Sequence, residues 1–168
     1  MKSLTKKLLT LLVAPAVLLS FTTHTYKTDF SGSWSLNESK SEFGEFGPRF
    51  AARKIKADQK DAAITISRTV TNQDGADVTN DEALTFDGKT VETTGLFNSK
   101  KKSTVKWADD GKSFVINYTI LFERDGETTE ITGKEAWSLS ADGKALTVQV
   151  NSSSSFGDFA SKAVYDKQ

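Results

Sequence analysis

Hydrophobic and polar residues alternate along most of the chain, and the alternation has a period of two. The clearest run places Phe114, Ile116, Tyr118, Ile120 and Phe122 on one face, with Val115, Asn117, Thr119 and Leu121 on the other. Such alternation is typical of a strand with one buried face. Similar runs are Ile64/Ile66/Arg68/Val70, Val78/Leu84/Phe86, Val105/Trp107, Ile131/Gly133/Glu135/Trp137/Leu139, Leu146/Val148/Val150 and Phe159/Ala163/Tyr165. The pattern predicts about ten strands.

The predicted strands are separated by Asp-Gly pairs, at residues 74–75, 87–88, 110–111, 125–126 and 142–143. Asp-Gly favours type I′ hairpin turns, in which both central residues need a positive φ. Short strands joined by tight turns allow a sandwich or a barrel. We favour closure into a barrel, because closure removes exposed strand edges. The expected fold is therefore all-β: a single antiparallel up-and-down β-barrel of about 8–10 strands.

Few segments depart from this pattern. Gly44–Pro48 and the Ser-rich Asn151–Gly157 indicate loops, and Asn37–Ser41 indicates one helical turn. Lys100, Lys101 and Lys102 form the single basic run of the barrel segment, which we interpret as a solvated hairpin tip. Little or no further helix is expected after residue 25, and no linker divides the chain.

The first 25 residues have the pattern of a secretory signal peptide. Lys2, Lys6 and Lys7 precede an apolar stretch, Leu8–Leu19, and small polar residues follow it. The stretch has about 12 residues, whereas a spanning helix needs roughly 20, so no membrane span is expected. A buried or membrane-lying N-terminal helix is the alternative. We expect cleavage between Thr22 and Tyr26, residues 1–25 as leader, residues 26–168 as the barrel domain, and a periplasmic or extracellular location.

Composition excludes several classes of function. The chain carries 22 basic and 22 acidic residues, and the leader holds three of the basic ones and none of the acidic ones. The remaining domain has a net charge of −3, which argues against nucleic acid as a partner. Cysteine is absent and the one histidine, His24, lies at the expected cleavage site. Thiolate, histidine-dependent and common metal chemistries are therefore excluded. We expect no enzyme, no metal and no cofactor.

Three segments carry recognisable motifs: Gly32-Ser33-Trp34 within Phe30–Lys40, Trp137–Val148, and Val164–Lys167. The first is similar to the Gly-x-Trp start of lipocalins and fatty-acid-binding proteins. The second and third are similar to the penultimate hairpin and the last strand of bacterial secreted lipocalin-like domains of the calycin type. The resemblance implies a barrel around a cavity for a small apolar molecule. Fatty-acid-binding proteins carry an arginine two residues before the tyrosine that matches Tyr165, and here Ala163 stands there.

Inward-facing aromatic and charged residues are the candidate ligand-binding side chains: Arg68, Phe86, Trp107, Tyr118, Glu135, Trp137 and Tyr165. Gly32 and Trp34 are expected to close one end of the barrel as a structural plug. Arg68 interrupts an apolar row, so it either ends that row at the rim, binds an anionic group, or pairs with Glu135. A buried charge is costly unless it is paired.

The leading hypothesis is an exported, non-enzymatic barrel that holds a small, predominantly apolar ligand. The alternative is a structural or protein-interaction barrel of the cell envelope with a filled core, with Gly47–Ala52 and Asn151–Ser155 as candidate contacts. An enzyme that used Glu135, Tyr118 or Arg68 is the third possibility.

Overall fold

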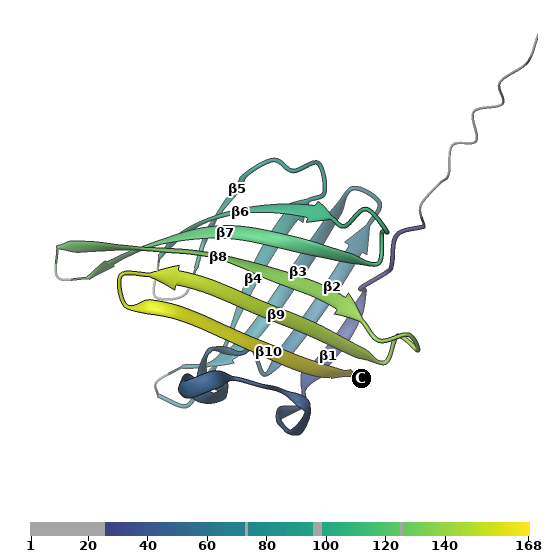
Figure 1. Cartoon of the computed structure of the whole chain (residues 1–168), viewed down its shortest axis with the longest axis horizontal. Helices are drawn as coiled ribbons and strands as arrows, with labels where there is room; N and C mark the ends of the chain where they lie inside the picture. Colours follow the sequence, from purple (N-terminus) through teal and green to yellow (C-terminus); the bar gives the residue numbers. More distant parts are fainter. Residues whose placement is uncertain (1–25, 73, 96–98, 125) are drawn as a thin grey trace, which may run out of the picture.

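The chain folds into one antiparallel sheet that curls into a nearly closed barrel (Figure 1). A computed structural model describes residues 26–168 apart from residues 73, 96–98 and 125. The predicted signal peptide therefore lies outside the described residues. The ten strands are β1 (Gly32–Leu36), β2 (Lys54–Lys60), β3 (Ala63–Thr71), β4 (Asp77–Thr85), β5 (Val91–Thr94), β6 (Lys100–Trp107), β7 (Ser113–Arg124), β8 (Glu127–Leu139), β9 (Ala145–Ser154) and β10 (Gly157–Lys167). The predicted all-β class and strand number are confirmed.

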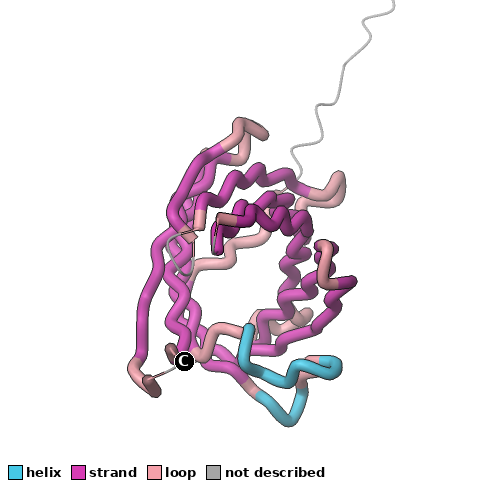
Figure 2. The backbone as a smooth tube through the Cα atoms, turned by 90° about the vertical axis from the view of Figure 1, so that its left-hand side faces the viewer, coloured by secondary structure: helices cyan, strands magenta, loops and turns pink. Residues whose placement is uncertain are grey.

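Strand order follows the chain, and the two ends of the barrel segment meet. The order across the sheet is β4-β3-β2-β1-β10-β9-β8-β7-β6-β5, so β1 pairs with both β2 and β10. Figure 2 looks along the barrel and shows the strands as a ring. The strands β4 and β5 are the two ends of the hydrogen-bonded order. A seam without strand pairing therefore lies between β4 and the β5–β6 hairpin. The predicted barrel is present, but its closure by hydrogen bonds is incomplete.

Strand register assigns one face of every strand to the interior. In antiparallel pairs, residues directly opposite each other point to the same face. Phe114 is opposite both Trp107 and Trp137, and Ile66 is opposite both Ala57 and Glu82. The predicted inward rows are confirmed at these positions, because Phe114, Trp137 and Ile66 are all fully buried.

Two short 3₁₀ segments lie beside β10 and join β1 to β2 (Figures 1 and 2). The first, η1 (Glu38–Lys40), is the helical turn predicted at Asn37–Ser41, and the Asn37 side chain caps it by accepting from the Lys40 N–H. The second, η2 (Gly44–Phe50), occupies the segment predicted to be a loop. Gly47 interrupts it with φ 62°, ψ −164°, so two short turns meet there and no regular helix forms.

Two other local predictions were wrong. The segment Asn151–Gly157 is not a loop, because β9 continues to Ser154 and β10 begins at Gly157. Lys100–Lys102 is not a hairpin tip, because these residues begin β6 and pair with β7. In both cases, polar residues suggested a loop, whereas the ladder of a neighbouring strand fixes their conformation.

Three of the five Asp-Gly turns differ from the predicted type I′ geometry. In each of these the glycine N–H donates to the carbonyl three residues earlier: Gly75 to Asn72, Gly111 to Ala108 and Gly143 to Ser140. The aspartate therefore occupies the third position of the turn and the glycine the fourth, where its positive φ is needed. Asp142 caps its turn, since its side chain accepts from the Lys144 N–H.

None of the helical segments among the described residues is long and apolar enough to cross a membrane.

Candidate functional site: the barrel interior

One half of the barrel interior is filled by aromatic side chains. Phe114 stacks on Trp137 with ring centroids 5.3 Å apart, and Phe30 meets Phe114 edge-on at 4.8 Å. Phe86 and Trp107 continue the cluster toward the surface, 4.8 Å apart. Offset and edge-on contacts of this kind stabilise a core beyond the apolar area that they bury. This half of the barrel is a packed core.

The segment before β1 lies across the end of this filled half. The Phe30 N–H donates to the Gln59 side chain at 3.1 Å, and Gln59 donates to the Thr28 carbonyl at 2.9 Å. The Lys27 ammonium lies 5.4 Å from the Trp107 ring, within range of a cation–π contact. We name this end the closed end.

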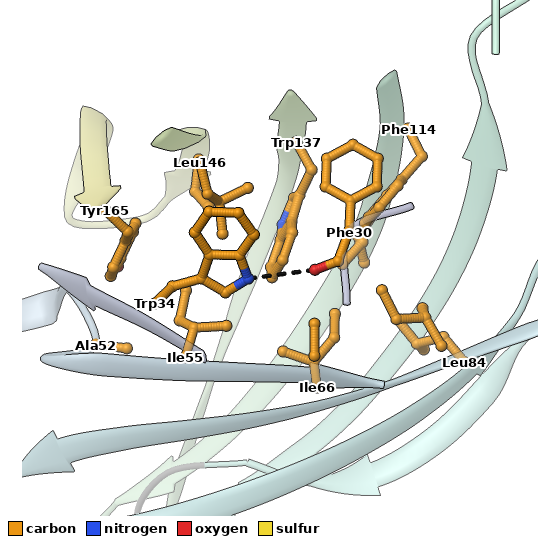
Figure 3. Close-up of a cluster of buried hydrophobic side chains, with 14 of the residues drawn as sticks. Phe30, Trp34, Ala52, Ile55, Ile66, Leu84, Phe114, Trp137, Leu146 and Tyr165 are labelled. Carbon is orange, nitrogen blue, oxygen red and sulfur yellow. Dashed lines mark hydrogen bonds between the residues drawn. The ribbon is translucent and has the colours of Figure 1, made fainter. Parts of the chain in front are cut away.

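Trp34, which with Gly32 forms the predicted plug, belongs to the buried core. It is buried, and its indole Nε1 donates to the Phe30 carbonyl at 3.2 Å (Figure 3). Gly32 has a φ of 144°, and a side chain there would meet Lys167, whose ammonium lies over the Trp34 ring. The Gly-x-Trp motif therefore joins the start of β1 to the end of β10.

Inward-facing side chains in the opposite half of the interior keep part of their surface exposed to solvent. Val78 faces inward opposite Val70, yet 39% of its surface is exposed. The other inward-facing apolar residues of this half are only half-buried: Val70, Ile120, Ile131, Val150 and Phe159. At the closed end, by contrast, Phe30, Phe114 and Trp137 have no exposed surface. We name the accessible half the open half.

A network of four charged side chains lies between the filled and open halves. Arg68 on β3 donates from Nη1 to Glu82 Oε2 at 2.9 Å and from Nη2 to Glu135 Oε2 at 2.7 Å. Lys101 on β6 donates to the same Glu82 oxygen at 2.9 Å. Each of the two cations therefore contacts a carboxylate, and the network has no net charge.

Neutral side chains also donate hydrogen bonds to both carboxylates. Ser103, buried on β6, donates to Glu82 Oε1 at 2.6 Å. Trp137 Nε1 donates to Glu135 Oε2 at 3.2 Å, and the Arg68 guanidinium lies 5.6 Å from the Trp137 ring. Burial of an ion pair is tolerated when such additional bonds satisfy its oxygen atoms. The network therefore joins β3, β4, β6 and β8 across the interior.

These contacts keep Glu82 and Arg68 ionised. Burial alone would raise the pKa of Glu82, but Arg68 and Lys101 outweigh burial and lower it to about 2. For Arg68, burial would lower the pKa, and the two glutamates together raise it above its usual value. A charged carboxylate next to a charged guanidinium is consequently the stable state at neutral pH.

Tyr118 lies flat on the inner wall. A Cβ atom on Gly133, which is opposite Tyr118 on β8, would lie 2.5 Å from the tyrosine hydroxyl, so only glycine leaves room for the ring. The Lys101 ammonium lies 5.3 Å from the centre of the same ring. Burial raises the Tyr118 pKa to about 12, and Glu135 adds to this effect. The hydroxyl stays protonated and able to donate a hydrogen bond.

The structure distributes the seven predicted ligand-binding residues over three levels. Arg68, Tyr118 and Glu135 lie close together at the base of the open half, where Arg68 is bonded to Glu135. Trp137 and Tyr165 are buried in the core, and burial raises the pKa of Tyr165. Phe86 and Trp107 lie at the closed end, where Trp107 Nε1 is buried without a partner among the described residues. The predicted pairing of Arg68 with Glu135 is confirmed.

Sequence reasoning missed Glu82, Lys101 and Ser103. The alternation contained a signal for each of them. Glu82 belongs to the same set of alternating positions as the apolar Leu84 and Phe86, and Lys101 and Ser103 belong to the same set as Val105. The charged residues Asp81 and Lys102, next to them in the chain, made this alternation hard to recognise. Within the described parts of the chain, no group of three or more acidic or histidine side chains could hold a metal ion.

Two hollows lie on the outer face of the sheet. One, of about 620 Å³, lies over β5–β8 and includes Glu92, Lys102 and Leu121. The other, of about 550 Å³, lies over β1–β4 and includes Ser35, Lys56 and Thr69. Both are lined mainly by lysine, threonine and serine side chains, in contrast to the apolar wall of the open half.

Comparison with known proteins supports the fold. No protein-family model matches the sequence, and no curated protein sequence matches it. Among solved structures, the wild-type fluorescent protein UnaG shares 19% identity with a TM-score of 0.52, over 83% of this chain and 97% of that protein. The two proteins therefore share a fold, an antiparallel β-barrel. Zebrafish ileal bile acid-binding protein, complexed with cholic acid, covers similar shares, 83% and 98%, at 16% identity and a TM-score of 0.49.

Proposed function

We propose that this calycin-type barrel is a non-enzymatic binding protein that holds a small, predominantly apolar molecule in its open half. One observation carries the proposal: inward-facing apolar residues there, above all Val78 at 39% exposure, are accessible to solvent. A monomeric protein gains by burying such surface, at about 25 cal/mol per Å². A ligand that entered the open half would cover it.

The chemistry of the open half fits such a ligand. Its wall is apolar at Val70, Val150 and Ile131, and its base offers the Tyr118 hydroxyl and the charge network. Binding sites for small molecules combine mostly apolar walls with a few fixed polar groups. The filled closed end limits the ligand to the open half, so Phe86 and Trp107 are assigned to the core.

The same network argues against catalysis. A general acid or base works best with a pKa close to the operating pH. Glu82 is held far below that range and is bonded to Arg68, Lys101 and Ser103. Its carboxylate oxygens are committed to these bonds, which supports a binding role.

The test places a large side chain inside the open half. In Val150→Trp, an indole would occupy the space beside Glu135, since Val150 is inward-facing and opposite Glu135 on β8. Gln149→Trp places the same group on the exposed outer face of β9 and is the matched control. We expect the unmodified barrel and the control to bind a neutral apolar fluorescent probe, and Val150→Trp to lose at least about tenfold in affinity.

The alternative, a protein-interaction barrel with no ligand, is favoured by the filled closed end and the two outer hollows. It makes opposite predictions for the same experiment. The unmodified barrel would bind no probe, and Val150→Trp would lower the unfolding temperature by overpacking a closed interior. Binding of the probe with unchanged stability of the variant would exclude the alternative.

A further inference from the structure

The charge network has a consequence for the kind of polar group that the open half accepts. Arg68 and Lys101 are the two cations at its base, and each is already bonded to a carboxylate at 2.7–2.9 Å. Arg68 is 20% exposed and Lys101 12%, so a ligand can approach both. It would meet cations and carboxylates within the same few ångströms.

A ligand carboxylate would gain little from this arrangement. Its attraction to Arg68 is opposed by repulsion from Glu82 and Glu135, which bind the same guanidinium. Transfer of an ion out of water is unfavourable unless the new site supplies uncompensated opposite charge and hydrogen bonds. A hydroxyl or carbonyl group loses much less on transfer and can still bond to Tyr118 or to a free N–H of Arg68.

We propose that the open half selects uncharged amphiphiles, such as long-chain alcohols, over carboxylates of the same chain length. This inference rests on the proposed binding function and names its ligand class. The interior glutamates act as specificity-determining residues, because they neutralise the two cations that would otherwise attract an acid. Arg68 could bind a ligand carboxylate if Glu135 did not already occupy its guanidinium.

The experiment compares dodecanol with dodecanoate at neutral pH, each displacing a neutral apolar fluorescent probe. The two ligands share one chain and differ in the charge of the head group. The variants are Glu135→Gln, which removes one interior negative charge, and Glu130→Gln, which removes the same charge from the exposed outer face of the same strand. Circular dichroism and cooperative unfolding establish that each variant is folded.

We expect the unmodified barrel and Glu130→Gln to bind the alcohol at least about tenfold more tightly than the acid. In Glu135→Gln the network gains a net positive charge, so this ratio is expected to fall at least about tenfold, through tighter binding of the acid. Glu82→Gln is expected to act in the same direction, and it replaces Glu135→Gln if that variant does not fold.

Three results would overturn the inference, and each has a different consequence for the proposed binding function. Equal or tighter binding of the acid by the unmodified barrel removes the selectivity but retains the binding function. An unchanged ratio in a folded Glu135→Gln removes the role assigned to the glutamates. Failure of the barrel to bind the probe or either ligand removes the proposed function itself.

Discussion

At the scale of single residues, the interior depends on pairs in which one side chain makes room for another. Gly133 is needed because Tyr118 occupies the volume of its absent side chain, with a potential Cβ also 2.9 Å from the Asn151 carbonyl. An inward-facing glycine within an alternating strand could be recognised in the sequence. Its partner could not, because the register between β7 and β8 decides which aromatic residue covers it.

This pairing leads to a prediction for Gly133→Ala. The added methyl group must displace Tyr118 and the β9 backbone, so we expect a loss of about 1–3 kcal/mol in the free energy of unfolding, measured with urea. In the Tyr118→Leu background the same change should cost less, because the ring and hydroxyl are gone. Lys134→Ala, exposed at the next position of β8, is the control. Equal costs of Gly133→Ala in both backgrounds would contradict the pairing.

At the scale of elements, alternation was a reliable guide to strands and a poor one to their ends. The serines of β9 and the lysines of β6 have low strand preference, yet ladder bonds to β8, β10 and β7 hold them extended. The seam could not be predicted at all. Glu82 on β4 bonds to Lys101 and Ser103 on β6, past the short β5, so its partners are set by how far the sheet curls.

The seam gives a prediction on pH. The pKa of Glu82 falls from 4.5 to about 2 on folding, so its contribution to stability is complete above pH 4.5 and is lost as the pH falls toward 2. A shift of this size corresponds to a loss on the order of 3 kcal/mol. We expect Glu82→Gln to be less stable than the unmodified barrel at neutral pH, with the difference shrinking over this window.

Free energies of unfolding from urea titrations along the acid range measure this difference. Glu130→Gln, altered on the exposed face of β8, is expected to follow the unmodified barrel throughout. A constant difference between Glu82→Gln and the unmodified barrel from neutral pH to the acid limit would show that Glu82 does not join the seam as an ionised group.

At the scale of the whole molecule, the fold separates two tasks between the ends of one barrel. Aromatic packing and the Gly-x-Trp motif stabilise the closed end, and the neutral charge network marks the boundary with the open half. The lengths of β7–β10, which reach up to 13 residues, extend the wall beyond the network on one side (Figure 1). The proposed binding function needs both a stable base and an accessible mouth, which this division supplies.

The location of this barrel is the last prediction. We propose that residues 1–25 direct export, since a basic start and a short apolar stretch are what a secretory signal peptide requires. Expression of the full chain in a bacterium, followed by intact-mass measurement of the exported fraction, should find a protein that begins between residues 23 and 26. Leu12→Arg, which charges the apolar stretch, should leave the uncleaved chain inside the cell, whereas Thr5→Arg, within the basic start, should not. An exported Leu12→Arg protein, or an uncleaved unmodified chain retained with it, would contradict the assignment and leave the binding function of the barrel to be judged on its own tests.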